Sequence, residues 1–137
     1  MILLRLAGVG LILLAFLHIP IGRTLQWRED GKKLSPANEQ IFHVHTFFIC
    51  LVVVLMGLPC LLAPGIFLER SEAGLWLAAS LSAFWIFRLY FQFFVYRVDL
   101  WKGKRMETVL HWWFSFIWLA LASLFAGCVL YQLGVID

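Results

Sequence analysis

Apolar residues fill four long stretches of the chain, and short polar stretches separate them. The predicted helices cover about residues 2–20, 36–63, 74–96 and 106–134. Each is close to or longer than the roughly 20 residues that cross about 30 Å of hydrocarbon. The pattern therefore predicts an all-α integral membrane protein, with four transmembrane helices in one up-down bundle and a single domain over 1–137.

Proline, glycine and serine mark the expected helix ends. Pro20 and Gly22 predict the end of the first helix. Ser35 followed by Pro36 is typical of an N-cap and a first helical position, so the second helix is expected to begin there. Pro59 is expected to bend the second helix without breaking it, because neighbouring helices tolerate proline in a membrane.

Composition supports the membrane assignment. Hydrophobic residues make up 63% of the chain and charged residues 14%, against about 25% charged in a soluble domain. The net charge of +3 is small and gives no argument for a nucleic-acid partner. The cysteines all lie in apolar stretches without a CxxC spacing, so we interpret them as buried apolar residues.

The basic residues predict the orientation. Most of them lie in the stretches 23–38 and 97–105 or beside these, namely Arg23, Arg28, Lys32, Lys33, Arg97, Lys102, Lys104 and Arg105. The positive-inside rule then places these loops in the cytoplasm and both termini outside, in a plasma membrane or bacterial inner membrane.

This topology predicts that the histidines gather near the cytoplasmic end of the bundle: His18, His43, His45 and His111. Glu39 and Glu107 each precede a histidine by four residues, so each carboxylate shares a helix face with an imidazole. We interpret His18, His43 and His111 as candidate metal or haem ligands. Glu39, Glu107 and His45 are further ligands or groups that orient the imidazoles.

Three interpretations of this cluster stay open. Imidazole and carboxylate ligands suit a transition metal, although di-metal bundles use Glu-x-x-His rather than the Glu-x-x-x-His found here. Two histidines on different helices also suit haem b. The third interpretation has no cofactor, because histidine suits a membrane interface and glutamate is favoured in the first turn of a helix. The group would then serve proton or ion movement, or would have no chemical role.

Arg88 is the second unusual residue, because an arginine inside a span is costly and calls for a partner. Gln92 lies one turn away on the same face. The candidate partners are Glu39, Glu107, backbone carbonyls or an anion such as a haem propionate or a lipid phosphate. The alternative is that the Arg88 side chain reaches back to the interface.

The working hypothesis is a membrane protein for metal- or haem-linked redox chemistry; whether it is an enzyme is left open. In span count and histidine content the chain resembles small four-helix membrane proteins that bind haem, but that likeness includes no motif and does not give function. One alternative is an accessory or scaffolding subunit of a larger membrane complex, which packs through the aromatic residues of the third helix. Another is a small transporter subunit that oligomerises. No nucleotide-binding loop, HExxH or Gly-x-Ser-x-Gly motif is present.

Overall fold

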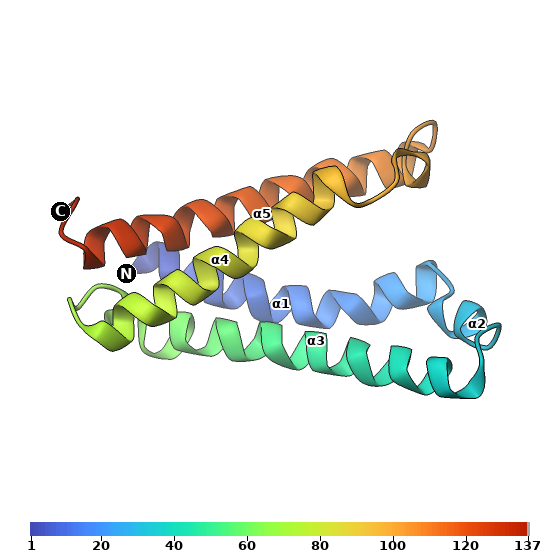
Figure 1. Cartoon of the computed structure of the whole chain (residues 1–137), viewed down its shortest axis with the longest axis horizontal. Coiled ribbons are helices and arrows are strands. Elements are labelled where there is room, and N and C mark those ends of the chain that lie inside the picture. The colour runs from blue at the N-terminus through green and yellow to red at the C-terminus, as the bar shows by residue number, and fades with distance from the viewer. Residues whose placement is uncertain (137) are drawn as a thin grey trace. The chain divides into compact units, whose positions relative to one another are not determined.

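The computed structural model describes residues 1–136 (Figure 1). Helices and turns make up this part of the chain, and no strand occurs in it. The elements in chain order are α1 (Ile2–Thr24), α2 (Trp27–Gly31), α3 (Pro36–Leu62), η1 (Pro64–Phe67), α4 (Glu72–Phe94), η2 (Val98–Leu100) and α5 (Arg105–Gln132).

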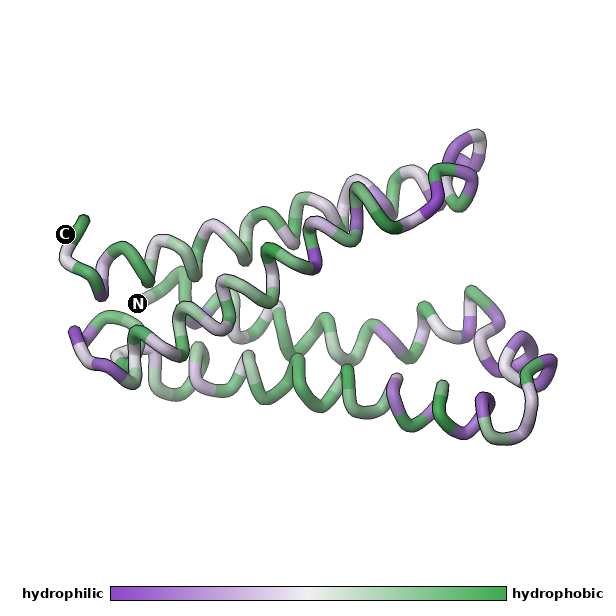
Figure 2. Tube along the Cα trace, viewed as in Figure 1, coloured by the Kyte–Doolittle hydropathy of each residue, from purple (hydrophilic) through white to green (hydrophobic). Residues whose placement is uncertain are grey.

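Four of these helices are long and apolar enough to cross a membrane: α1, α3, α4 and α5, with 23, 27, 23 and 28 residues. Figure 2 shows the same division, with apolar residues along the helices and hydrophilic residues concentrated at the turns. The predicted all-α class is confirmed, and the four helices fit an integral membrane protein.

The chain forms two compact units, Met1–Pro64 and the residues from Gly65 onward. In unit 1, α1 and α3 pack side by side and the short α2 joins them (Figure 1). In unit 2, α4 and α5 pack against each other. Each unit is therefore a helical hairpin, and the single up-down bundle of four helices stays a prediction.

The helix ends follow local chemistry. Ser35 caps α3 as expected, because its side chain accepts a hydrogen bond from the backbone N–H of Asn38 and Pro36 occupies the first turn. The end of α1 differs from the sequence-based expectation, since the helix passes through Pro20 and ends at Thr24. The Thr24 hydroxyl donates to the Pro20 carbonyl, and a membrane helix tolerates an internal proline.

Unit 1 is held together where α1 and α3 cross at two glycines. A Cβ added to Gly8 would lie 2.8 Å from the Gly57 carbonyl oxygen, and one added to Gly57 would lie 2.9 Å from the Gly8 carbonyl oxygen. The two backbones approach this closely only because neither residue has a side chain. Leu4, Leu11 and Val53 are buried around this crossing.

Unit 2 has an aromatic core. Trp85 of α4 and Trp118 of α5 stack with their ring centroids 5.0 Å apart, and both are buried. At the other end of the hairpin, the Gln132 side chain accepts from the Ser71 N–H and donates to the carbonyls of Ile66 and Glu69. That one amide ties the segment before α4 to the end of α5.

Candidate functional site

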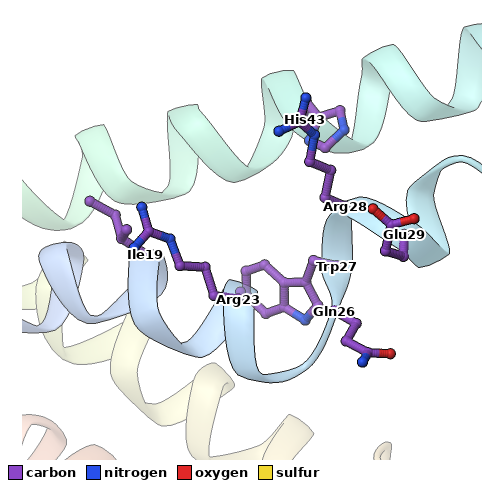
Figure 3. Close-up of a pocket in the computed structure, with 8 residues that line it drawn as sticks. Ile19, Arg23, Gln26, Trp27, Arg28, Glu29 and His43 are labelled. Atoms are coloured by element: carbon purple, nitrogen blue, oxygen red, sulfur yellow. The ribbon is translucent and has the colours of Figure 1, made fainter.

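The polar end of unit 1 contains a pocket between α1, α2 and α3 (Figure 3). Its volume is about 360 Å³, within the range of about 300–1,000 Å³ typical of ligand sites. The side chains that matter for its chemistry are Ile19, Arg23, Trp27, Arg28, Glu29 and His43.

A tight reversal between α1 and α2 builds this pocket. Gln26 adopts a left-handed backbone conformation, with φ of 54°, and so turns the chain back. The Trp27 ring then lies against Gly22, where an added Cβ would be 3.0 Å from the ring. Trp27 also meets His18 and Phe42, with ring centroids 6.4 Å and 6.1 Å away. The turn therefore fixes one aromatic side chain between α1 and α3.

Positive charge in this pocket has no carboxylate partner. Both acidic residues of α2 pair with lysines: Lys32 Nζ lies 3.0 Å from a Glu29 oxygen, and Lys33 Nζ lies 2.6 Å from an Asp30 oxygen. The hydrogen bond to Asp30 raises the pKa of Lys33. No ion pair or hydrogen bond of Arg23 or Arg28 is described in residues 1–136, and Figure 3 shows Arg28 reaching toward His43. The two guanidinium groups are therefore available to an anion.

His18 and His45 each use one ring nitrogen within their own helix. His18 Nδ1 lies 3.0 Å from the Leu14 carbonyl oxygen, and His45 Nδ1 lies 2.9 Å from the Ile41 carbonyl oxygen. A carbonyl can only accept, so Nδ1 carries a proton in both rings. The neutral form of each imidazole then has its lone pair on Nε2, which suits a ligand nitrogen.

His43 and Glu39 occupy the start of α3 beside the pocket. His43 is exposed and its ring contacts Phe42, with centroids 5.5 Å apart. Glu39 is half-buried, and both residues border the buried Gly31 at the end of α2. The two side chains share one helix face as expected, but no hydrogen bond between them is described.

His111 belongs to a buried polar network in unit 2. Its Nδ1 lies 2.8 Å from Gln92 Nε2, and the Trp118 indole nitrogen lies 3.3 Å from Gln92 Oε1. Gln92 is 6% exposed and His111 is 7% exposed, so this network is shielded inside the hairpin. Trp101 stacks on the imidazole with centroids 3.9 Å apart.

The order of donors in this network assigns the proton on His111. The indole N–H of Trp118 can only donate, so the oxygen of the Gln92 amide must face it. The amide nitrogen then faces His111 Nδ1, which therefore accepts. The neutral His111 carries its proton on Nε2 and presents a donor, whereas His18 and His45 present an acceptor.

Arg88 lies on α4, one turn before Gln92, and has aromatic partners. Its guanidinium carbon is 4.9 Å from the centre of the Trp118 ring and 5.4 Å from the centre of the Tyr96 ring. These cation–π contacts stabilise the charge of Arg88, and the sequence alone did not predict them. No contact of Arg88 with Glu107 or a backbone carbonyl is described within residues 1–136.

The combined histidine cluster stays a prediction, because its members belong to two units. His18, His43, His45 and Glu39 lie in unit 1, whereas Glu107, His111, Arg88 and Gln92 lie in unit 2. Glu107 is half-buried in the first turn of α5, where the helix dipole favours a carboxylate. Among the described residues, no group of three or more His, Cys, Asp or Glu side chains is placed to hold a metal ion.

Comparisons with family models, with curated proteins and with solved structures found no match to this chain. A function for this chain is therefore inferred from the residues of the two hairpins themselves.

The sequence identified some of these residues and missed others. Helical spacing places Arg88 and Gln92 on one face, and the cost of an arginine inside a span predicts that Arg88 has a partner. The positive-inside rule accounts for Arg23 and Arg28 as topology signals and does not predict a pocket at these residues. Trp118 lies seven residues after His111, a spacing that places both on one face of α5, and this signal could have been used.

Proposed function

We propose that this is an integral membrane protein that binds a phosphate-bearing amphiphile, an anionic phospholipid, at the polar end of unit 1. The observation that supports the proposal is the pocket lined by Arg23, Arg28 and His43, where both carboxylates of α2 are paired with lysines. Guanidinium groups form charge-assisted hydrogen bonds to phosphate oxygens, often two at a time.

The position of the pocket suits such a ligand. It lies where α1 ends and α3 begins, so it borders the apolar spans, and Ile19 and Trp27 give it apolar walls. Tryptophan is favoured at the headgroup level of a membrane. A headgroup in this pocket would leave its acyl chains along the exposed apolar surfaces of α1 and α3.

The proposed orientation agrees with this function. The basic stretches 23–38 and 97–105 favour the cytoplasmic side. The cytoplasmic leaflet carries the anionic lipids, and basic pockets at that side of transmembrane helices bind their headgroups. Both the orientation and the lipid belong to the same proposal.

The test is native mass spectrometry of the detergent-purified protein titrated with phosphatidylglycerol, with phosphatidylcholine as the neutral comparison. We expect the double variant Arg23→Gln/Arg28→Gln to bind phosphatidylglycerol about 30-fold more weakly, from about 1 kcal/mol per basic residue. Arg97→Gln is the matched control, because Arg97 is exposed and paired with Asp99. Equal binding by all three proteins would refute the proposal.

A redox protein with haem or a transition metal is the second candidate. The observation that favours it is the open Nε2 of His18, whose Nδ1 is bonded to the Leu14 carbonyl. In unit 1, His18 and His43 would be the ligands, and Arg23 and Arg28 would hold haem propionates; haem would supply electron transfer. His111 fits a ligand role poorly, because its Nδ1 is engaged and its Nε2 carries the proton.

Spectroscopy decides this second candidate. A Soret band in the purified protein that disappears in His18→Ala, with membrane insertion retained, would support haem. Stoichiometric metal without a Soret band would support a metal centre instead. If lipid, haem and metal are all absent from folded protein, the accessory-subunit interpretation gains weight. Most of the aromatic residues of the third helix that it requires are exposed on α4: Phe84, Phe87, Tyr90, Phe91, Phe93 and Phe94.

A further inference from the structure

Arg88 is a cation inside a predicted span whose hydrogen-bonding groups are unused. The aromatic rings of Trp118 and Tyr96 lie near its guanidinium carbon. Cation–π contacts hold the charge but leave the N–H donors without acceptors. No hydrogen bond or ion pair of Arg88 is described in residues 1–136. In lipid, donors of a charged group are strongly driven to find an acceptor.

The Trp118 ring beside Arg88 is held in place by contacts that do not involve Arg88. Trp118, which lies next to the guanidinium, is itself fixed by its hydrogen bond to Gln92 and by stacking on Trp85 and Phe114, with centroids 5.0 Å and 5.5 Å away. Gln92 in turn is held by His111. The network therefore positions the aromatic platform, and Gln92 and His111 are positioning residues for Arg88.

The depth of Arg88 indicates the source of the acceptor. Arg88 precedes Phe94, the last residue of α4, by about 9 Å along the helix axis. Its contact with Tyr96, which lies beyond the helix end, brings the side chain toward the polar end of unit 2. Acidic groups of membrane lipids lie at that level, with their chains in the apolar region.

We propose that Arg88 and its aromatic platform form a site in unit 2 for the acidic group of a membrane-borne amphiphile, either a phosphate or a long-chain carboxylate. This site is separate from the arginine pocket of unit 1 and does not depend on the function proposed for that pocket. The planar guanidinium donates two parallel N–H bonds to either oxyanion, and lysine cannot reproduce this geometry.

The experiment uses the full-length protein in detergent and measures binding of two probes by native mass spectrometry. Phosphatidic acid supplies the phosphate and oleate supplies the carboxylate; preference between them identifies the source. All measurements are made in the Arg23→Gln/Arg28→Gln background, so that the pocket of unit 1 does not contribute. We expect Arg88→Gln to weaken binding of the preferred probe about tenfold, and Arg88→Lys to weaken it nearly as much.

Two further variants test whether binding needs the aromatic platform around Arg88 or only a positive charge. Arg105→Gln removes a guanidinium from the exposed start of α5, for which no aromatic contact is described, and should leave binding unchanged. Gln92→Leu should weaken binding severalfold while Arg88 is retained, because the platform loses its support. Binding that is equal in Arg88→Gln and in the parent, or equally reduced in Arg105→Gln, would overturn the proposal.

Discussion

One indole N–H determines which nitrogen of His111 carries a proton. Trp118 fixes the Gln92 amide, and the amide fixes the imidazole. A histidine of unit 1 has the opposite tautomer. His18 donates its Nδ1 proton to the Leu14 carbonyl, so its lone pair lies on Nε2. Equivalent histidines in the sequence thus have opposite hydrogen-bonding roles, which the helical spacing alone does not distinguish.

This difference predicts a spectroscopic result. In protein labelled with ¹⁵N-histidine, we expect neutral His111 to give the Nε2–H pattern and neutral His18 and His45 to give the Nδ1–H pattern. Trp118→Phe removes the donor that orients Gln92, so His111 should become a mixture of tautomers. Ser115→Ala is the control, because the Ser115 hydroxyl bonds only the His111 carbonyl. An Nδ1–H pattern for His111 in the parent protein would contradict the assigned network.

At the scale of elements, two glycines determine how closely α1 and α3 approach. A Cβ on Gly8 would lie 2.7 Å from the backbone nitrogen of Leu61, whereas a Cβ on Gly10 would meet nothing within 4 Å. Ala122/Ala126 and Ser123/Gly127 of α5 also have the small-xxx-small spacing that suits close helix packing. Gly127 also meets nothing within 4 Å. A small-residue pattern on one helix does not say which face the partner covers, because that depends on the register of both helices.

Gly8→Ala should therefore loosen the hairpin of unit 1. The methyl group meets backbone atoms that cannot rotate away, and we expect a loss of about 1–3 kcal/mol in the free energy of unfolding. Gly10→Ala, two residues away, should be neutral or stabilising by about 0.5–1 kcal/mol, because alanine favours the helix. Denaturation titrations in mixed micelles compare the two variants. Equal losses in both would mean that the crossing at Gly8 does not form.

A second stability prediction concerns the hydrogen bonds of Gln132, at the end of α5 in unit 2. Gln132→Leu keeps the apolar volume but leaves the Ser71 N–H and the Ile66 and Glu69 carbonyls without their partner. We expect a loss of about 3 kcal/mol in the free energy of unfolding. Gln40→Leu, at an exposed position of α3, should change it little. The same micelle titration measures both, and a small effect of Gln132→Leu would show that the Gln132 amide does not tie these elements together.

Local signals in the sequence were sufficient for the elements but insufficient for their assembly. Ser35 and Pro36 predicted the start of α3 correctly, because capping depends on neighbouring residues alone. Pro20 misplaced the end of α1 by a turn, because the tolerance of a span for proline depends on its surroundings. The sequence did not predict the aromatic partners of Arg88, because these depend on which face of α5 packs against α4. Contacts between two helices depend on the residues of both, so the pattern of one helix does not predict them.

For the whole molecule, the histidine cluster depends on how the hairpins assemble. The hairpin topology brings His18 and His43 to one end of unit 1 and places His111 near the start of α5 in unit 2. Each of these placements follows from chain direction alone. A site shared by all the histidines needs the two hairpins to associate in the membrane, and the sequence supplies no pairing signal for that step.

Orientation is the prediction on which the lipid proposed for the pocket of unit 1 depends. With the native cysteines replaced by alanine, Lys32→Cys and Lys104→Cys should resist a membrane-impermeant maleimide added to sealed cells, because both positions lie in the basic stretches. Val135→Cys, which follows α5 and is exposed, should react from outside. All three should react once the membrane is opened. External labelling of Lys32→Cys and Lys104→Cys would reverse the topology and move the arginine pocket of unit 1 away from the anionic cytoplasmic leaflet. Labelling of only one of them would show that the hairpins insert in opposite directions, which would separate His43 from His111 by the thickness of the membrane.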